Sequence, residues 1–145
     1  MLEKEFIPYE ESSELKELGF KESCLAAYFV FGYYGQTKPE LFINGIGKQL
    51  EDRIEELEKH AYFDLSVPTF SQAFRWFREN YNLHSNISSW RSDDSLSFYH
   101  EFEIYSLTSS YSAGDEYPTY EEAELACLRK LIEIVKEKHN VGDLH

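Results

Sequence analysis

The residue types best suited to molecular recognition gather in one stretch of the chain. Tryptophan, tyrosine and arginine anchor binding sites because each combines a large rigid contact area with a hydrogen bond or a charge. On a helix, residues three positions apart share a face, as two of the arginines here would. The stretch predicts a binding patch for a base, a peptide or another protein. Its members are Arg75, Trp76, Arg78, Tyr81, His84, Trp90 and Arg91.

A structural interpretation of the same residues competes with this one, and we favour it. Trp76 would lie in the core, since large aromatic side chains are mostly buried. Arg75 and Arg78 would pair with nearby carboxylates, because acidic residues outnumber basic ones in this half of the chain. Surface pairs of that kind are common and carry no function.

Other residues capable of chemistry show no spacing typical of a known site. The histidines form no metal-binding pattern such as HxH or HExxH, so we expect no metal and no cofactor. Gly45, Gly47 and Lys48 lack the spacer and hydroxyl of a phosphate-binding loop. Cys24 and Cys127 lie far apart without a CxxC motif and are expected to be buried, reduced thiols. No catalytic residue is predicted, although a fold can gather catalytic groups from distant positions.

The net charge indicates which classes of partner are favoured. The chain of 145 residues has 14 basic and 27 acidic residues, a net charge of -13. The excess is spread over both halves, with 7 basic and 14 acidic residues in 1–67 and 7 and 13 in 68–145. Phosphate backbones attract clustered Lys and Arg, so nucleic-acid binding is disfavoured. A protein partner with a basic surface is expected instead.

The elements that would position these residues follow from periodicity and capping signals. The high aromatic share, 17%, indicates a folded core. Apolar spacing of three and four predicts helices, and alternation predicts strands. A loop or a short third strand is expected near Tyr111. The helices are expected at 8–19, 48–61, 69–81 and 119–138, and the strands at 24–34, 41–43, 83–90 and 96–107.

These elements predict an α+β fold, a small antiparallel sheet packed against amphipathic helices. We expect a single domain over 1–145, with an N-terminal half at 1–67 and a helix-strand-strand-helix half at 68–145. Alternation places Phe98, His100, Phe102 and Ile104 on the expected buried face of the last strand. Because the N-terminus lacks a signal-peptide pattern and no apolar run reaches about 20 residues, we expect a cytoplasmic protein without membrane contact.

Four segments resemble a family of small uncharacterised proteins from phages and prophages of Bacteroidetes. The resemblance implies a mobile-element gene in a bacterial cytoplasm, and it implies no activity. Residues 38–67 are the least similar part and are treated as a variable region. The similar segments are 6–9 (FIPY), 15–20 (LKELGF), 68–81 (PTFSQAFRWFRENY) and 120–136 (YEEAELACLRKLIEIVK).

A second likeness concerns topology. The expected order from Thr69 onward, helix, strands, helix, is similar to that of double-stranded-RNA-binding domains. In those domains, lysines at the start of the last helix contact the phosphate groups of the RNA. The corresponding residues here, 119–124, contain three carboxylates, so the likeness does not extend to that function.

Three functions remain open. The first is a non-enzymatic accessory protein that binds a basic protein partner, or, in a sharper form, a DNA mimic in a basic groove. The second is a nucleic-acid-binding module that uses the predicted patch. The third is a small enzyme of an unrecognised type.

Overall fold

The computed structural model describes residues 2–31, 39–43, 61–112 and 114–142. The chain divides into two compact units, Met1–Thr69 and Phe70–His145. The single domain expected over 1–145 stays a prediction. Each unit combines helices with an antiparallel three-stranded sheet, so the α+β class is confirmed, with two sheets where one was expected. Residues 48–60 of the helix expected over 48–61 lie outside the described residues.

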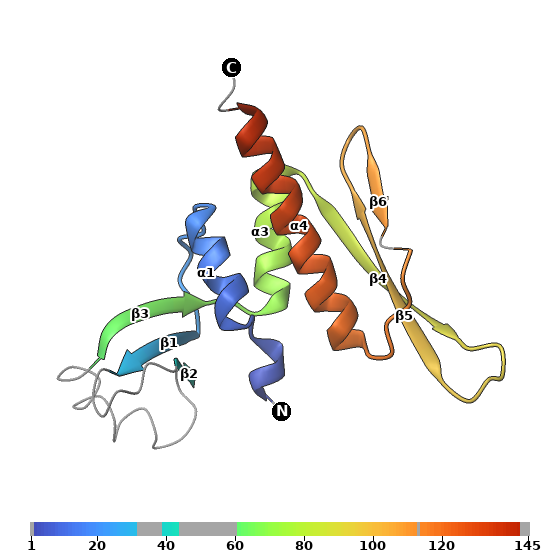
Figure 1. Ribbon diagram of the computed structural model, residues 1–145, viewed down its shortest axis with the longest axis horizontal. Coiled ribbons are helices and arrows are strands. Elements are labelled where there is room, and N and C mark those ends of the chain that lie inside the picture. Colours follow the sequence, from blue (N-terminus) through green and yellow to red (C-terminus); the bar gives the residue numbers. More distant parts are fainter. Residues whose placement is uncertain (1, 32–38, 44–60, 113, 143–145) are drawn as a thin grey trace. The chain divides into compact units, whose positions relative to one another are not determined.

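The described residues of unit 1 form a short 3₁₀ helix, an α-helix and a three-stranded sheet (Figure 1). The sheet has the order β2-β1-β3, and both pairings are antiparallel. Its core is formed by Phe6, Ala26 and Val67, against which Tyr28, Leu41 and Ile43 pack. The elements are η1 (Leu2–Glu5), α1 (Tyr9–Glu17), β1 (Ala26–Phe31), β2 (Glu40–Ile43) and β3 (Ala61–Val67).

Helix α1 ends where the sequence predicts, and local chemistry is the reason. Gly19 has a φ of 104°, a conformation that favours glycine. The N–H of Gly19 donates to the carbonyl of Lys16 at 3.1 Å, and the N–H of Phe20 donates to that of Leu15 at 2.9 Å. This pair of bonds is a Schellman motif.

Strand β3 corrects the expected extent of the helix before it. Ala61, the predicted last apolar position of that helix, is the first residue of β3 and is paired with Phe31 of β1. Helical periodicity is a local signal, and pairing with a strand thirty residues away overrides it here.

Unit 2 has the order helix, three strands, helix, and α3 and α4 lie side by side (Figure 1). Both helices contact the sheet, whose strand order is β4-β5-β6. Near Tyr111 either a loop or a short third strand was expected, and the structure has the strand. Unit 2 therefore has one strand more than the predicted helix-strand-strand-helix order. The elements are α3 (Phe70–Tyr81), β4 (His84–Arg91), β5 (Phe98–Tyr105), β6 (Ser110–Ser112) and α4 (Tyr120–Gly142).

The core of unit 2 follows from the apolar spacing of α4. Apolar residues at helical spacing are buried along one side of the helix, and they are Ala123, Cys127, Leu131, Ile134 and Val135. The helix begins with a capping box between Thr119 and Glu122. The N–H of Glu122 donates to Oγ1 of Thr119 at 3.1 Å, and the N–H of Thr119 donates to Oε2 of Glu122 at 3.2 Å.

The expected buried face of β5 is buried only over half the strand. Phe102 and Ile104 are buried, whereas Phe98 is 59% exposed. Phe98 is the first residue of β5 and pairs with Arg91 at the turn end of the β4–β5 hairpin, which Figure 1 shows projecting away from α3. No helix in the described ranges has both the length and the apolar character needed to cross a membrane.

Candidate functional site

The structure separates the residues of the predicted patch. Trp76 is 5% exposed and packs edge-on against Phe77 and Tyr81, with ring centroids 5.0 and 5.3 Å apart. It belongs to the core of unit 2. Arg75 and Arg78 are exposed on the same helix, α3.

The remaining members of the patch lie at opposite ends of β4. His84 begins the strand and shares a hydrogen bond with Asn82 at 3.1 Å, while Trp90 and Arg91 end it. Six positions of extended chain separate His84 from Trp90 by about 20 Å. Tyr81 is close to His139 of α4, with Oη 3.5 Å from Nε2. The seven residues therefore do not form one surface, and whether any of them binds a partner stays a prediction.

Both cysteines were expected to be buried, but only Cys127 is buried, and Cys24 is partly exposed. Burial raises the pKa of the Cys127 thiol to about 12. The pKa of Cys24 is raised to about 11, first by burial and then by the charge of Glu22. A reactive cysteine needs a lowered pKa, so neither has the character of a nucleophile. Within the described ranges, no three His, Cys, Asp or Glu side chains gather as a metal site would require.

A different set of residues comes together on one face of the β4–β5–β6 sheet. The β4–β5 register pairs His84 with Tyr105, Asn86 with Glu103, Ser88 with Glu101 and Trp90 with Tyr99. Paired residues of antiparallel strands lie on the same face, and alternate pairs share it. The buried Phe102 and Ile104 belong to the other set of pairs, which faces the helices. We call the first eight residues the outer face and the helix-packed side the inner face.

Side-chain contacts agree with this assignment. The Tyr105 hydroxyl donates a hydrogen bond to the Glu103 carboxylate. Nδ2 of Asn86 donates to Oγ of Ser88 at 3.1 Å. Both bonds join residues two positions apart along a strand, which is the spacing of neighbours on one face.

The outer face is electrostatically negative. It contains Glu101 and Glu103 and no lysine or arginine. The hydrogen bond to Glu103 is the largest cause of a raised pKa at Tyr105. The pKa of Tyr99 is also raised, first by desolvation and then by the charges of Glu101, Glu116 and Asp93. Nearby negative charge disfavours the phenolate form, so the surrounding carboxylates contribute to the raised pKa of both tyrosines.

Aromatic rings flank these carboxylates. Trp90 is 53% exposed and Tyr105 is 44% exposed. Between the two rings on the outer face lie the short side chains of Asn86 and Ser88. An exposed Trp or Tyr beside a carboxylate is a good site for a cation, because the ring face attracts positive charge. The alternation of β5 placed Glu101 and Glu103 on one face, but only the register with β4 brings Trp90 to them.

A second group that the sequence does not reveal is a Ser-His pair on the inner face. Oγ of Ser89 is 2.7 Å from Nδ1 of His100 on the neighbouring strand, and the His100 ring lies edge-on to Tyr120 at 5.8 Å. Catalytic Ser-His pairs also need a group that orients the histidine. Among the described residues, no carboxylate is hydrogen-bonded to this ring.

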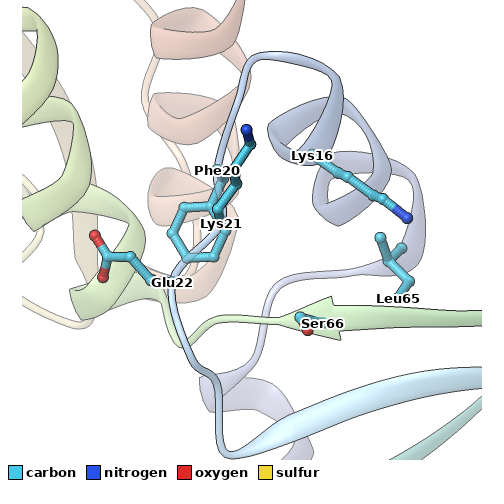
Figure 2. A pocket seen from close by; sticks show the side chains of 6 residues that line it. All are labelled: Lys16, Phe20, Lys21, Glu22, Leu65 and Ser66. Carbon is cyan, nitrogen blue, oxygen red and sulfur yellow. The ribbon is translucent and has the colours of Figure 1, made fainter.

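A pocket of about 330 Å³ lies in unit 1 between the end of α1 and β3 (Figure 2). Its lining residues are Lys16, Phe20, Lys21, Glu22, Leu65 and Ser66. Figure 2 shows the ammonium groups of Lys16 and Lys21 pointing in different directions, and Glu22 extending away from both. Polar groups of a binding pocket converge on the ligand. Because these groups diverge, the pocket does not form an anion site.

Comparison of the chain with protein-family models, with curated proteins and with solved structures gives no match. Neither the resemblance to phage proteins nor any activity receives support from these comparisons.

Proposed function

We propose that this protein is a non-enzymatic binding protein whose outer face receives a basic segment of a partner protein. The observation that supports this proposal is the joint presence of Glu101 and Glu103 with exposed aromatic rings on one sheet face. This surface takes the place of the patch predicted around Arg75 and Trp76.

The chemistry of the outer face matches a lysine or arginine side chain. A carboxylate accepts two hydrogen bonds from a guanidinium group, and such charge-assisted bonds are stronger than neutral ones. A cation over the face of Trp90 gains about 0.5–1 kcal/mol at an exposed position. Both contributions favour a basic ligand over an acidic one, because a second negative group would be repelled.

The charge of the whole chain supports the same partner. A net charge of -13 steers positively charged surfaces toward the protein over distances beyond direct contact. Such steering raises the association rate and depends on ionic strength. The proposed origin as a phage or prophage accessory protein in the cytoplasm of a bacterium rests on the four similar segments alone.

Nucleic-acid binding has less support. The element order of unit 2 agrees with the likeness to double-stranded-RNA-binding domains, but the start of α4 is acidic. There Glu122 is engaged in the capping box with Thr119, and Glu121 lies beside it. A phosphate backbone would meet carboxylates where such domains use lysines.

The proposal is tested by titrating the protein into a fluorescently labelled basic peptide and recording anisotropy. In the double variant Glu101→Gln/Glu103→Gln, we expect affinity to fall at least about tenfold, which corresponds to about 1.4 kcal/mol. Glutamine keeps the shape and a hydrogen-bond acceptor, so the loss would report charge. Binding by the wild-type protein should also weaken as ionic strength rises from about 0.1 to about 1 M and the Debye length falls from about 10 to about 3 Å.

The matched control is Glu133→Gln/Glu137→Gln, which removes the same charge from an exposed part of α4. Helix α4 contacts the inner face, so this variant should retain most of the affinity. Equal losses in the two double variants would show that net charge, and not the outer face, controls binding. Tighter binding of a labelled RNA duplex than of the peptide would favour the nucleic-acid alternative.

A further inference from the structure

Among the described residues, no strand pairs with the outer edge of β4, so backbone hydrogen-bonding groups point outward along it. The strand order puts β4 at the edge of the sheet. On the next strand, the backbone of His100 exchanges two hydrogen bonds of 2.8 Å with Tyr117, so it points away from β4. Ser89, the register partner of His100, therefore directs its own N–H and C=O groups outward from the sheet. By alternation, Ser85, Ile87 and Arg91 do the same.

This edge lacks the features that normally prevent strand addition. Protected edges have a lysine, a proline, a bulge or a short strand. Strand β4 has no proline and no lysine, and its charged residue, Arg91, is the last of the strand, in a chain with 28% charged residues. Its register with β5 continues from end to end without a shift. The edge is thus eight residues long and regular.

Side chains on the outer face leave room for long residues from an added strand. Asn86 and Ser88, the β4 residues paired with Glu103 and Glu101, are short. A strand added beside β4 would lie about 5 Å from β4 and about 10 Å from β5. A lysine or arginine on it can lie across Asn86 or Ser88 and reach a carboxylate with its charged end.

The spacing of the carboxylates sets the spacing of the basic residues. Glu101 and Glu103 are two positions apart on β5, about 7 Å along the strand. Alternate residues of an extended segment have the same separation. From these observations we infer that the partner segment binds in an extended conformation along the edge of β4, as a fourth strand, with Lys or Arg at alternate positions. The inference rests on the proposed function and specifies how the basic segment is recognised.

A second copy of the chain fits the edge less well than a basic segment. Pairing of two β4 strands would bring together two outer faces, each with Glu101 and Glu103, and two chains with a charge of -13 each. Like charges across an interface oppose association. We therefore assign the edge to a basic partner segment.

The test compares labelled peptides of identical composition by anisotropy. One has basic residues at alternate positions and the other has them in a block, and we expect the alternating peptide to bind at least about tenfold more tightly. Two further versions of the alternating peptide are N-methylated on every second backbone nitrogen. One version has the methyl groups on the odd-numbered residues and the other has them on the even-numbered residues. Only one set faces β4 in a paired strand, so one version should lose binding and the other should retain it.

A protein variant tests the same contact from the other side. Ser89→Pro removes an outward N–H while leaving the β4–β5 hydrogen bonds in place, because proline is tolerated at strand edges. We expect a loss of peptide affinity that Ser89→Ala does not reproduce, with an unchanged circular dichroism spectrum for both. Should Ser89→Pro unfold the protein, the two N-methylated peptides still decide the question.

The outcomes separate the inference from the proposed function. If no basic peptide binds, both are wrong. If block and alternating peptides bind equally and neither methylated version loses affinity, the strand addition is wrong and the binding function remains. If light scattering shows a dimer that Ser89→Pro dissociates, a second copy occupies the edge and the inference is overturned.

Discussion

At the scale of single residues, Glu103 gives the outer face a negative charge at a fixed position. It accepts the hydrogen bond of Tyr105 and lies opposite Asn86 on the next strand. A carboxylate held in this way has a fixed direction, so its side chain does not have to be ordered when a cationic group binds. Pre-organisation of this kind lowers the entropic cost of binding.

The two thiols give a prediction that concerns reactivity and pH. Only a thiolate reacts readily with a disulfide reagent, and the pKa values of about 11 for Cys24 and about 12 for Cys127 leave about 0.1% or less ionised at pH 8. We expect modification of Cys24 to be slow at pH 8 and to accelerate about tenfold per pH unit up to pH 10. Cys127, which is fully buried, should react only when the protein unfolds.

Absorbance kinetics with an aromatic disulfide reagent measure both rates, and the variants Cys24→Ser and Cys127→Ser separate them. Rapid modification of Cys127 in the native protein at pH 8 would contradict the burial that raises its pKa.

At the scale of elements, the helix ends depend on local backbone chemistry. Gly19→Ala places a Cβ at a φ of 104°, where the added atom meets no neighbour within 4 Å but the backbone conformation is unfavourable. We expect a loss of about 1–2 kcal/mol in the free energy of unfolding. Urea denaturation measures it, with Glu17→Ala on the last turn of α1 as the control. An unchanged or increased stability would show that the helix does not end in the Schellman motif.

The same local chemistry explains which elements the sequence predicts well. Helices α1 and α4 were located by Gly19 and by the Thr119–Glu122 capping box, which act over a few residues. Strand β3 was missed because its pairing with β1 depends on residues far away in the sequence. The exposed Phe98 was placed in the core because alternation shows which face a residue occupies and does not show how far a helix covers that face.

The candidate site was harder to predict than the fold for a related reason. The predicted patch joined sequence neighbours, but a strand carries His84 and Trp90 about 20 Å apart. The outer face joins Ser88 to Glu101, which are distant in the sequence and adjacent across the register. The alternation along β5 groups Glu101 and Glu103 with Tyr99 and Tyr105 on one face, but only the register with β4 shows that Trp90 lies on that face too.

At the scale of the whole molecule, both units are acidic. Residues 1–69 contain 14 acidic and 7 basic residues, a net charge of -7, and residues 70–145 contain 13 and 7, a net charge of -6. The attraction of a basic partner is therefore a property of the entire chain. Discrimination among basic partners must come from a local surface, and the outer face with the β4 edge combines charge, exposed rings and outward-pointing backbone groups.

The measurement that tests this account most directly is a titration of the ¹⁵N-labelled protein with the alternating basic peptide, followed by NMR through its amide resonances. We predict that the shifts concentrate in β4 and β5, with the outward N–H groups of Ser85, Ile87 and Ser89 among the most affected. The amides of α1 and of the exposed side of α4 should change little. Shifts centred on Arg75 and Arg78 of α3, or spread evenly over both units, would contradict the account.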